Sequence, residues 1–277
     1  IQMEHEGDTI SAQTGVDNLD VNYYAIISGI TVDLSKTDDQ ITSFDGAATS
    51  GTVTGFENVD LTDYTGGFGA NMTAGSSTTG TYILEGTLVS DAIYGGLGDD
   101  RIIYNDSNGV NVDTVYNFTK GGATDTIIVD ISDLQTANAL VSTVTAVLND
   151  GAASAVAAGT MTIVEASAAT TISSAANDLI VVVGATFTAD TLGTAFEASG
   201  NRVLTINSTA SDVGDTIMTL YSDGTDAYLA AAVATTEDIA NTVFESDDLT
   251  IVNLVKISGI TSIAAGDFAA GDFEFVG

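Results

Sequence analysis

The sequence predicts an all-β protein whose parallel strands stack as a β-solenoid or β-roll, and three observations support this fold class. Residues 95–103 read GGLGDDRII, which fits the pattern G-G-x-G-x-D-x-U-x, where U is a large apolar residue. Each copy of that pattern forms one turn and one short strand of a parallel β-helix. An aspartate followed two residues later by an apolar residue recurs nearby, at Asp91, Asp113 and Asp125. Elsewhere the chain shows short β-branched and aromatic runs cut by turn residues, as expected of strands.

Residues 1–85 are expected to form an N-terminal, solenoid-like region. Residues 23–34 are rich in β-branched and aromatic residues, with Gly29 at an expected bend or bulge. Residues 52–61 alternate in part between apolar and polar side chains. We expect these strands to stack on the repeat segment as one continuous parallel structure. A separate small β-sandwich is the alternative that the sequence leaves open.

Residues 86–131 are expected to form a calcium-binding β-roll. Glycine permits positive φ, so a tight turn can direct several carbonyl oxygens inward. The aspartate adds a carboxylate, and calcium takes about six to eight oxygen ligands. Residues 86–94 keep the first glycine, the aspartate and the isoleucine of the nonamer, and residues 108–115 keep its register with asparagine in place of glycine.

The candidate metal ligands are the glycines, acids and one asparagine of these degenerate copies. They are Gly86, Asp91, Gly95, Gly96, Gly98, Asp99, Asp100, Gly109, Asn111, Asp113 and Asp125. Because only the step from Asp91 to Asp100 is a strict nonamer, we expect about one to three Ca²⁺ ions rather than a long ladder. The alternative is a glycine-rich turn region with solvated acids.

Residues 132–159 are expected to form one helix and a linker. Apolar residues from Leu134 to Leu148 recur at close to helical spacing. Ser132 or Asp133 would cap this helix, and residues 149–151, Asn-Asp-Gly, would end it. We expect the helix to cover an open end or face of the solenoid.

Residues 160–277 are expected to form a C-terminal β domain. Residues 179–183 are a continuous apolar run, typical of a strand buried on both faces. Residues 222–226 predict a hairpin turn. The other expected strands are 203–206, 216–221, 227–230 and 249–257, with a possible helix start at 236–238.

Residues 86–134 resemble the calcium β-roll of RTX (repeats-in-toxin) proteins, a group of type I secreted proteins that includes proteases, adhesins and bacterial surface-layer proteins. The nonamer carries the likeness, together with residues 113–134, which resemble the segment that usually closes such rolls. Asn117 stands where that family commonly has aspartate, and the chain has an insertion around Gly122. Residues 52–61 also resemble the G-x-E-N-x-D-L-S segments of large RTX adhesins and surface-layer proteins, which repeat one turn of a calcium-free solenoid.

The end of the chain carries a second resemblance. Residues 221–229, 254–261 and 271–277 look like the C-terminal modules of type I secreted proteins, which an exporter recognises and which are usually not cleaved. The resemblance implies an extracellular protein at the bacterial cell surface. We expect residues 257–277 to be needed for export and dispensable for the roll. Residues 1–7 lack a basic n-region and an apolar h-region, so we expect no signal peptide there and a chain that is a fragment or a processed form.

Composition excludes several classes of partner. The 277 residues carry 38 acidic and 5 basic side chains, for a net charge of -33. Nucleic acid is not expected as a partner because binding it requires a basic surface. The charge also opposes binding to an anionic membrane, whereas bound divalent cations would offset it. The absence of cysteine excludes disulfides and thiolate metal sites, and no apolar run is long enough to predict membrane insertion.

Catalysis has little support, and we expect that the protein is not an enzyme. His5 is the one histidine, so the chain has neither an H-E-x-x-H zinc site nor a Ser-His-Asp triad with a credible histidine. Acidic pairs are plentiful, and a glycosidase pair stays open as an alternative. Arg101, beside Asp100, is expected to reduce repulsion among the acids, with a salt bridge to a partner as its alternative role.

The expected function is that of a calcium-dependent structural subunit that assembles with copies of itself into a surface layer, sheath or filament. The alternative is a carbohydrate- or cell-binding module of a large RTX adhesin, which would bind a cell-surface glycan. A non-catalytic fragment of a secreted RTX enzyme is the third possibility.

Overall fold

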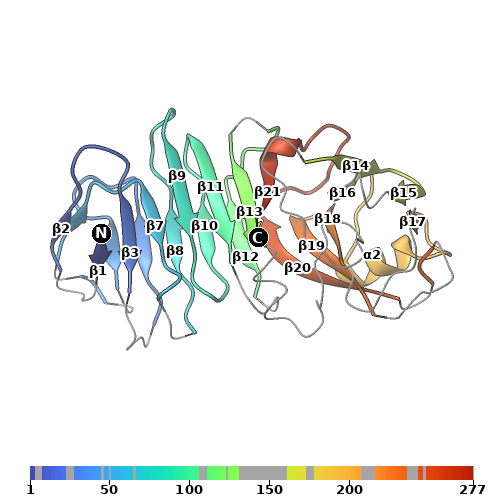
Figure 1. The fold of residues 1–277 in the computed structure, drawn as a ribbon, viewed down its shortest axis with the longest axis horizontal. Helices are drawn as coiled ribbons and strands as arrows, with labels where there is room; N and C mark the ends of the chain where they lie inside the picture. The colour runs from blue at the N-terminus through green and yellow to red at the C-terminus, as the bar shows by residue number, and fades with distance from the viewer. Residues whose placement is uncertain are drawn as a thin grey trace.

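The computed structural model describes residues 1–3, 8–22, 28–44, 47–49, 51–64, 67–105, 111–122, 124–130, 161–172, 178–206, 216–235, 243–245 and 248–276. The protein is mostly β and elongated, and most of its strand pairs are parallel (Figure 1). The expected all-β class is confirmed at this level. The helix expected within residues 132–159 and the helix start expected at 236–238 lie outside the described residues.

Two large sheets contain most of the strands. The seven-stranded sheet consists, in spatial order, of β1 (Gln2–Met3), β3 (Asn18–Val21), β7 (Asn58–Asp60), β9 (Thr81–Glu85), β11 (Asp99–Tyr104), β13 (Thr126–Asp130) and β21 (Phe273–Val276). The ten-stranded sheet consists of β14 (Ile163–Ala166), β16 (Leu179–Val182), β18 (Thr216–Ser222), β19 (Ala227–Ala234), β20 (Leu249–Ile257), β12 (Asp113–Tyr116), β10 (Ala92–Tyr94), β8 (Asn71–Thr73), β4 (Thr31–Asp33) and β5 (Ile41–Ser43).

Smaller elements complete the described chain. One two-stranded sheet pairs β2 (Ile10–Ser11) with β6 (Val53–Thr54), and another pairs β15 (Thr170–Ile172) with β17 (Leu204–Ile206). The helices of the described residues are α2 (Ala189–Phe196) and the 3₁₀-helix η1 (Ala270–Asp272). Helix α2 was not predicted; it is short but has a full capping box, in which Thr188 and Thr191 exchange side-chain and backbone hydrogen bonds.

Successive strands from β7 to β13 alternate between the two large sheets, so the chain coils around a shared interior (Figure 1). One turn of the coil brings Ile83 beside Arg101, two nonamer lengths further along the chain. The neighbouring turns are longer, as the pairing of Ile93 with Val115 shows. Because of the alternation, successive connections between the strands lie on opposite sides of the coil, where the chain crosses from one sheet to the other.

Apolar side chains stack in two columns between the sheets and form one hydrophobic cluster. Every side chain in these columns is at most 1% exposed. The seven-stranded sheet contributes Leu19, Val59, Leu84, Ile102, Ile127 and Phe273, and the ten-stranded sheet contributes Val32, Met72, Ile93, Val115 and Ile257. Burial of each large apolar side chain contributes about 1.5–3 kcal/mol. The apolar residues of the predicted nonamer copies therefore point inward, as expected.

The C-terminal part of the chain returns to the same two sheets. β20 pairs in parallel with β12, and β21 pairs in parallel with β13. β18 and β19 form the predicted hairpin, with Gly224 at a φ of 97°. The predicted strand at 249–257 is confirmed, and all four residues of β16 are buried, as its apolar run predicted.

Candidate functional site

The four repeated aspartates form two pairs, and the two pairs lie on opposite sides of the coil, where the chain crosses from one sheet to the other. Asp91 and Asp113 lie beside each other at the starts of β10 and β12, whereas Asp100 and Asp125 lie beside each other at the starts of β11 and β13. Asp91 and Asp100, neighbours in the repeat, are therefore not brought together. Any ion shared between successive turns would meet one pair or the other.

The pair of Asp100 and Asp125 is buried within the turn region. The backbone N–H of Asp100 donates to Oδ1 of Asp125 at 3.1 Å, and Oδ2 of Asp125 accepts from the N–H of Thr119 at 2.7 Å. Oδ2 of Asp100 accepts from the N–H of Gly96 at 2.6 Å. Oδ1 of Asp100 is buried and has no hydrogen-bond partner within the described part of the chain. Since a buried carboxylate oxygen without a partner is costly, this atom marks an incomplete polar site.

Burial penalises the charged form of both carboxyl groups of this pair. Burial raises the pKa of Asp100 to about 6, with further contributions from the charges of Asp125 and Asp99. Burial likewise raises the pKa of Asp125. A cation bound beside these two groups would offset the penalty that burial places on their charged forms.

The backbone carbonyl oxygens of Tyr116 and Asn117, in the following turn of the coil, lie close to the turn that contains Gly95 and Asp100. The space that a Cβ on Gly95 would fill lies 3.3 Å from the carbonyl oxygen of Asn117, 3.4 Å from that of Tyr116 and 3.5 Å from Oδ2 of Asp100. Asn117 adopts a φ of 60°, the left-handed region in which asparagine is favoured among non-glycine residues. It is thus the backbone of Asn117 that faces the site. Two carbonyl oxygens and a carboxylate oxygen therefore lie within 3.5 Å of the same point beside Gly95, and oxygen is the donor type that calcium prefers.

The expected reason for the glycines of the nonamer is wrong in one respect. Gly95, Gly96 and Gly98 do not adopt positive φ in this structure. Gly96 and Gly98 are required because the preceding turn of the coil lies too close: a Cβ on Gly96 would overlap the carbonyl oxygen of Gly75, and one on Gly98 would overlap that of Gly80. Asn111 does not adopt positive φ either.

The pair of Asp91 and Asp113 differs in how its oxygens are satisfied. Oδ1 of Asp91 accepts from the hydroxyl of Thr87 at 2.9 Å and from the N–H of Ala70, and its Oδ2 accepts from the N–H of Thr87 at 2.7 Å. The N–H of Asp91 donates to Oδ1 of Asp113 at 2.9 Å. Burial raises the pKa of Asp91 to about 6. Both carboxylate oxygens of Asp91 already accept hydrogen bonds from the protein, so this pair has less need of a bound cation than the pair of Asp100 and Asp125.

The remaining predicted ligands lie around these two pairs. Gly86 packs against Asp91, since a Cβ there would overlap the carboxylate. The side chain of Asp99 is exposed, and the amide nitrogen of Asn111 donates to the carbonyl of Leu88 at 3.1 Å. Gly109 lies outside the described residues. The assignments of Gly86, Asp99, Asn111 and Gly109 as ligands stay predictions.

Sequence reasoning missed a further buried carboxylate, Asp272, at the end of the chain. It is 0% exposed, and its oxygens accept from the N–H groups of Gly121, Gly122 and Ala269. Gly121 and Gly122 both have positive φ, so their consecutive N–H groups form a small anion-binding nest. The Gly-Gly pair, noted from the sequence only as an insertion, was the signal for this contact.

Arg101 also bonds to the end of the chain. Its guanidinium donates to Glu274 on β21 at 2.5 Å, and Lys120 pairs with Asp267 at 2.7 Å. Both ion pairs join the repeat segment to the last residues. The acid partner of Arg101 therefore lies within the chain itself.

Neither a metal-binding cluster among the described residues nor a match to a known protein adds to this candidate site. Within the described part of the chain, no group of three or more His, Cys, Asp or Glu side chains is arranged to hold a metal ion, and no helix is long and apolar enough to cross a membrane. No protein-family model matches the chain, and no curated protein matches it. The candidate site is thus defined by its own geometry: two buried carboxylates and the carbonyl oxygens of a neighbouring turn.

Proposed function

We propose that the chain is a calcium-ordered β-roll in which Asp100, Asp125 and the carbonyl oxygens of Tyr116 and Asn117 hold the ion. The observation that carries this proposal is the buried Oδ1 of Asp100, which has no hydrogen-bond partner among the described residues and belongs to a carboxylate close to the carbonyl oxygens of Tyr116 and Asn117. Bound calcium would supply positive charge there and offset the desolvation of two carboxylates. A cluster of acidic side chains is not required, because calcium accepts backbone carbonyls as ligands.

A melting experiment with two neighbouring variants tests the calcium site. A ligand present at 100 times its Kd adds about 2.7 kcal/mol of stability, so calcium should raise the Tm well above that measured in chelator. Asp100→Asn should remove most of this increase. Asp99→Asn is the matched comparison: it makes the same change of charge on an exposed side chain one residue away, which was predicted as a ligand but is not one of the four proposed here, and it should leave most of the increase intact. Equal melts with calcium and chelator, or equal losses in both variants, would contradict the proposal.

The biological role that we propose is structural: an extracellular subunit of a bacterial surface layer, sheath or filament, exported by type I secretion and assembling with copies of itself. Three features support it. The fold is an elongated stack of strands (Figure 1), the chain is strongly acidic, and the proposed ion lies between successive turns of the coil. Export is tested by fusing residues 257–277 to a reporter and measuring its secretion through a type I system. A reporter that stays inside the cell would count against this route.

A further inference from the structure

The outer side of the ten-stranded sheet forms a partly exposed surface between β4 and β20. Side chains alternate between the two sides of a strand, so the neighbours of the inward apolar column of this sheet point outward. We call the outward side chains of β4, β8, β10 and β12, together with Lys256 of β20, the β10 face. β8, β10, β12 and β20 lie side by side (Figure 1). Each side chain of the β10 face is at least partly exposed.

The β10 face carries no net charge. Its one acid is Asp33, its one base is Lys256, and its other side chains are those of Thr, Asn, Ala and Tyr. The chain as a whole has a net charge of -33. Two copies that meet through this face therefore avoid most of the carboxylate repulsion that opposes contact elsewhere.

The outer side of the seven-stranded sheet has the opposite character. Burial raises the pKa of Asp20, and the nearby charges of Asp60 and Asp63 raise it further. Arg101 is the one base at the outward positions of these strands, and it already pairs with Glu274. Two copies would repel strongly here, because the outward positions carry six acids. These are Asp20, Asp60, Glu85, Asp99, Asp130 and Glu274.

Two stacked tyrosines lie at the centre of the β10 face. The rings of Tyr94, on β10, and Tyr116, on β12, have centroids 4.5 Å apart and planes inclined by 9°. Both side chains are partly exposed. Because the stacking already restricts these rings, they lose little conformational freedom when a partner covers them. Tyrosine also combines a large apolar ring with a hydroxyl, and it is enriched in contacts between proteins.

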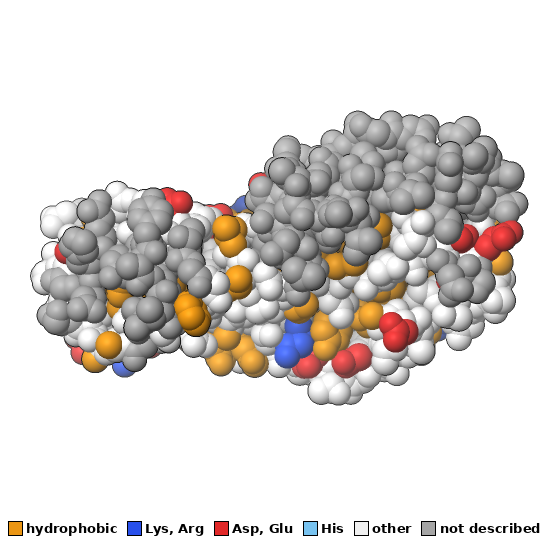
Figure 2. Space-filling view, turned by 90° about the horizontal axis from the view of Figure 1, so that it is seen from below, with side chains coloured by type: hydrophobic (Ala, Val, Ile, Leu, Met, Phe, Trp, Pro, Cys, Tyr) orange, Lys and Arg blue, Asp and Glu red, His pale blue; other side chains and the backbone are white. Residues whose placement is uncertain are grey.

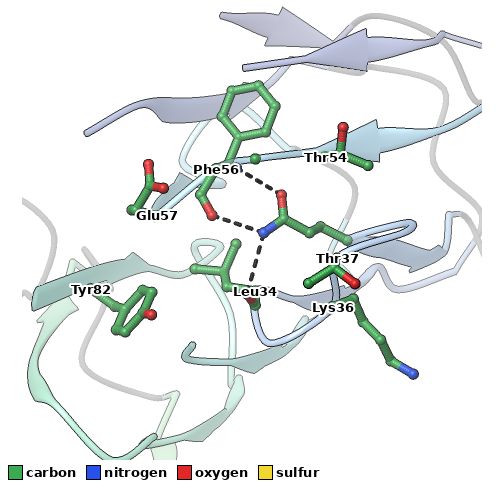
Figure 3. A pocket seen from close by; sticks show the side chains of 9 residues that line it. Leu34, Lys36, Thr37, Thr54, Phe56, Glu57 and Tyr82 are labelled. Carbon is green, nitrogen blue, oxygen red and sulfur yellow. Dashed lines mark hydrogen bonds between the residues drawn. The ribbon is translucent and has the colours of Figure 1, made fainter. Parts of the chain in front are cut away.

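The two charged side chains lie at opposite ends of the face, and both have unused bonding capacity. The Lys256 ammonium forms no ion pair within the described part of the chain. One carboxylate oxygen of Asp33 accepts from the N–H and the hydroxyl of Ser35, which leaves the other without a bond from those residues. The turn after Asp33 is held in place by the buried amide of Gln40, whose hydrogen bonds join it to the turn between β6 and β7 (Figure 3).

The order of the strands makes the face complementary to itself. β10 is the middle strand of the series β4-β8-β10-β12-β20, so a two-fold axis parallel to β10 places β4 of one copy over β20 of the other. Thr31 lies in the same row across the sheet as Lys256, and Asp33 follows two residues later on β4. This offset is about 6.6 Å, which the flexible lysine side chain can span. Asp33 of each copy therefore comes within reach of the other copy's lysine.

We infer that two copies of the chain pair through their β10 faces, with the two sheets packed face to face about this axis. Such a contact uses the same surface on both copies, so each charge pair occurs twice. The inference rests on the proposed self-assembly and names the surface at which it begins. The face is about 24 Å wide and two residues deep on each strand, smaller than the roughly 800 Å² per partner of a standard complex. The contact is therefore weak, and a layer needs a second contact to extend it.

Charge reversals at the two ends of the face test this pairing. Sedimentation velocity of the full chain in millimolar calcium gives the concentration at which half of it is associated. Lys256→Glu and Asp33→Lys should each raise that concentration about tenfold or more, since each places like charges opposite each other twice. Asp33→Lys is the sharper test, because it lowers the net negative charge and general repulsion would predict stronger association. The double variant restores both charge pairs and should associate close to the wild-type concentration.

A pair of threonine substitutions provides the matched control for net charge. Thr114 lies on the β10 face beside Ala92, whereas Thr81 is exposed on the outer side of the seven-stranded sheet. Thr114→Asp should weaken association about tenfold, and Thr81→Asp should change it little, although both add one negative charge. Circular dichroism and the Tm of each variant establish that its fold is intact.

The possible results separate this inference from the proposed function. A wild-type chain that stays monomeric up to about 1 mM would overturn both the inference and the self-assembly. Association that persists in the charge-reversal variants, or that does not return in the double variant, would overturn this face alone and leave self-assembly standing. Equal weakening by Thr114→Asp and Thr81→Asp would do the same, because net charge rather than this surface would then govern association.

Discussion

At the scale of single residues, the two aspartate pairs show two ways to satisfy a buried carboxylate in a stacked coil. Asp91 draws three hydrogen bonds from Ala70 and Thr87 and leaves neither oxygen unbonded. Asp100 has one protein donor, to Oδ2, and an unbonded Oδ1. The aspartate at the same repeat position therefore has both carboxylate oxygens hydrogen-bonded on one side of the coil and only one of them hydrogen-bonded, within the described residues, on the other side. The difference arises from two donors to Oδ1 of Asp91: the N–H of Ala70 and the hydroxyl of Thr87, which stands where the copy around Asp100 has Gly96.

The raised pKa of Asp91 makes stability depend on pH. Its pKa is about 6 in the folded state against 3.8 in the unfolded chain, so the folded state binds more protons between these values. Stability should therefore fall as the pH rises from about 4 to 6 and stay low above 6. The effect of this group is at most about 3 kcal/mol. Asp100 and Asp125 act in the same direction.

We expect the protein in chelator to melt at a higher temperature at pH 5 than at pH 7.5, as measured by circular dichroism. Asp91→Asn should reduce this difference, whatever it does to the Tm itself, because the amide does not titrate. A Tm that rises from pH 5 to pH 7.5 in the wild-type protein would show that ionisation of the buried aspartates does not destabilise the fold.

At the scale of elements, the turns of the coil depend on close backbone approach. Gly96→Ala should destabilise the protein by roughly 1–3 kcal/mol, because the new methyl group meets the carbonyl oxygen of Gly75 in the preceding turn. Leu97→Ala is the control at the next position, where the side chain is 67% exposed, and should change stability by less than about 0.5 kcal/mol. Urea denaturation measures both. Equal effects would show that the turns separate enough to admit a side chain.

The strands and their apolar faces could be predicted because each strand is a short run of β-branched residues whose alternation is visible in the local sequence. The inward positions Ile93, Ile102, Val115 and Ile127 followed from the nonamer alone. Which aspartates lie beside each other in the candidate site could not be predicted, because this depends on the number of residues in each turn of the coil. A strict nonamer relates Asp91 to Asp100, yet the coil pairs Asp100 with Asp125. Long-range pairing such as β12 with β20 leaves no local signal in a single sequence.

The last strand and the loop before it form a clasp on the repeat segment. Phe273 and Phe275 are buried in the core, and Phe268 stacks on Phe118. Asp272 fills the nest of Gly121 and Gly122. These contacts argue against the expectation that residues 257–277 are dispensable for the roll, because their removal would uncover the edge of β13. A segment recognised by an exporter would have to be recognised before the clasp closes.

Asp272→Ala tests the clasp. It leaves the N–H groups of Gly121, Gly122 and Ala269, which are partly buried in these contacts, without their acceptor, at a cost of about 1–3 kcal/mol. Asp267→Ala removes an acid of the same segment that is partly exposed and bonded to Lys120, and surface ion pairs contribute about 0–1 kcal/mol. Thermal melts and limited proteolysis near the C-terminus should both separate the two variants. Equal stability would mean that the nest contributes little to holding β21.

At the scale of the whole molecule, the charge is distributed rather than concentrated. Figure 2 shows acidic side chains scattered along the described part of one face, with hydrophobic side chains gathered toward its middle. Two copies approaching each other would therefore repel at most contact geometries. Apolar contact alone has to overcome a net charge of -33 on each copy.

Calcium should control self-assembly, and monovalent salt should not replace it. Salt screens charges beyond a Debye length of about 8–10 Å at physiological ionic strength, whereas charges in a tight interface lie closer together than that. Calcium can order the turns and bridge carboxylates between copies. Magnesium should substitute poorly, because it requires near-octahedral geometry and releases its water reluctantly. We therefore expect light scattering to rise in millimolar calcium and to stay low in sodium chloride of equal ionic strength and in magnesium. Equal assembly in sodium chloride would show that calcium is not the switch, and no assembly in any of the three salts would favour the monomeric binding module.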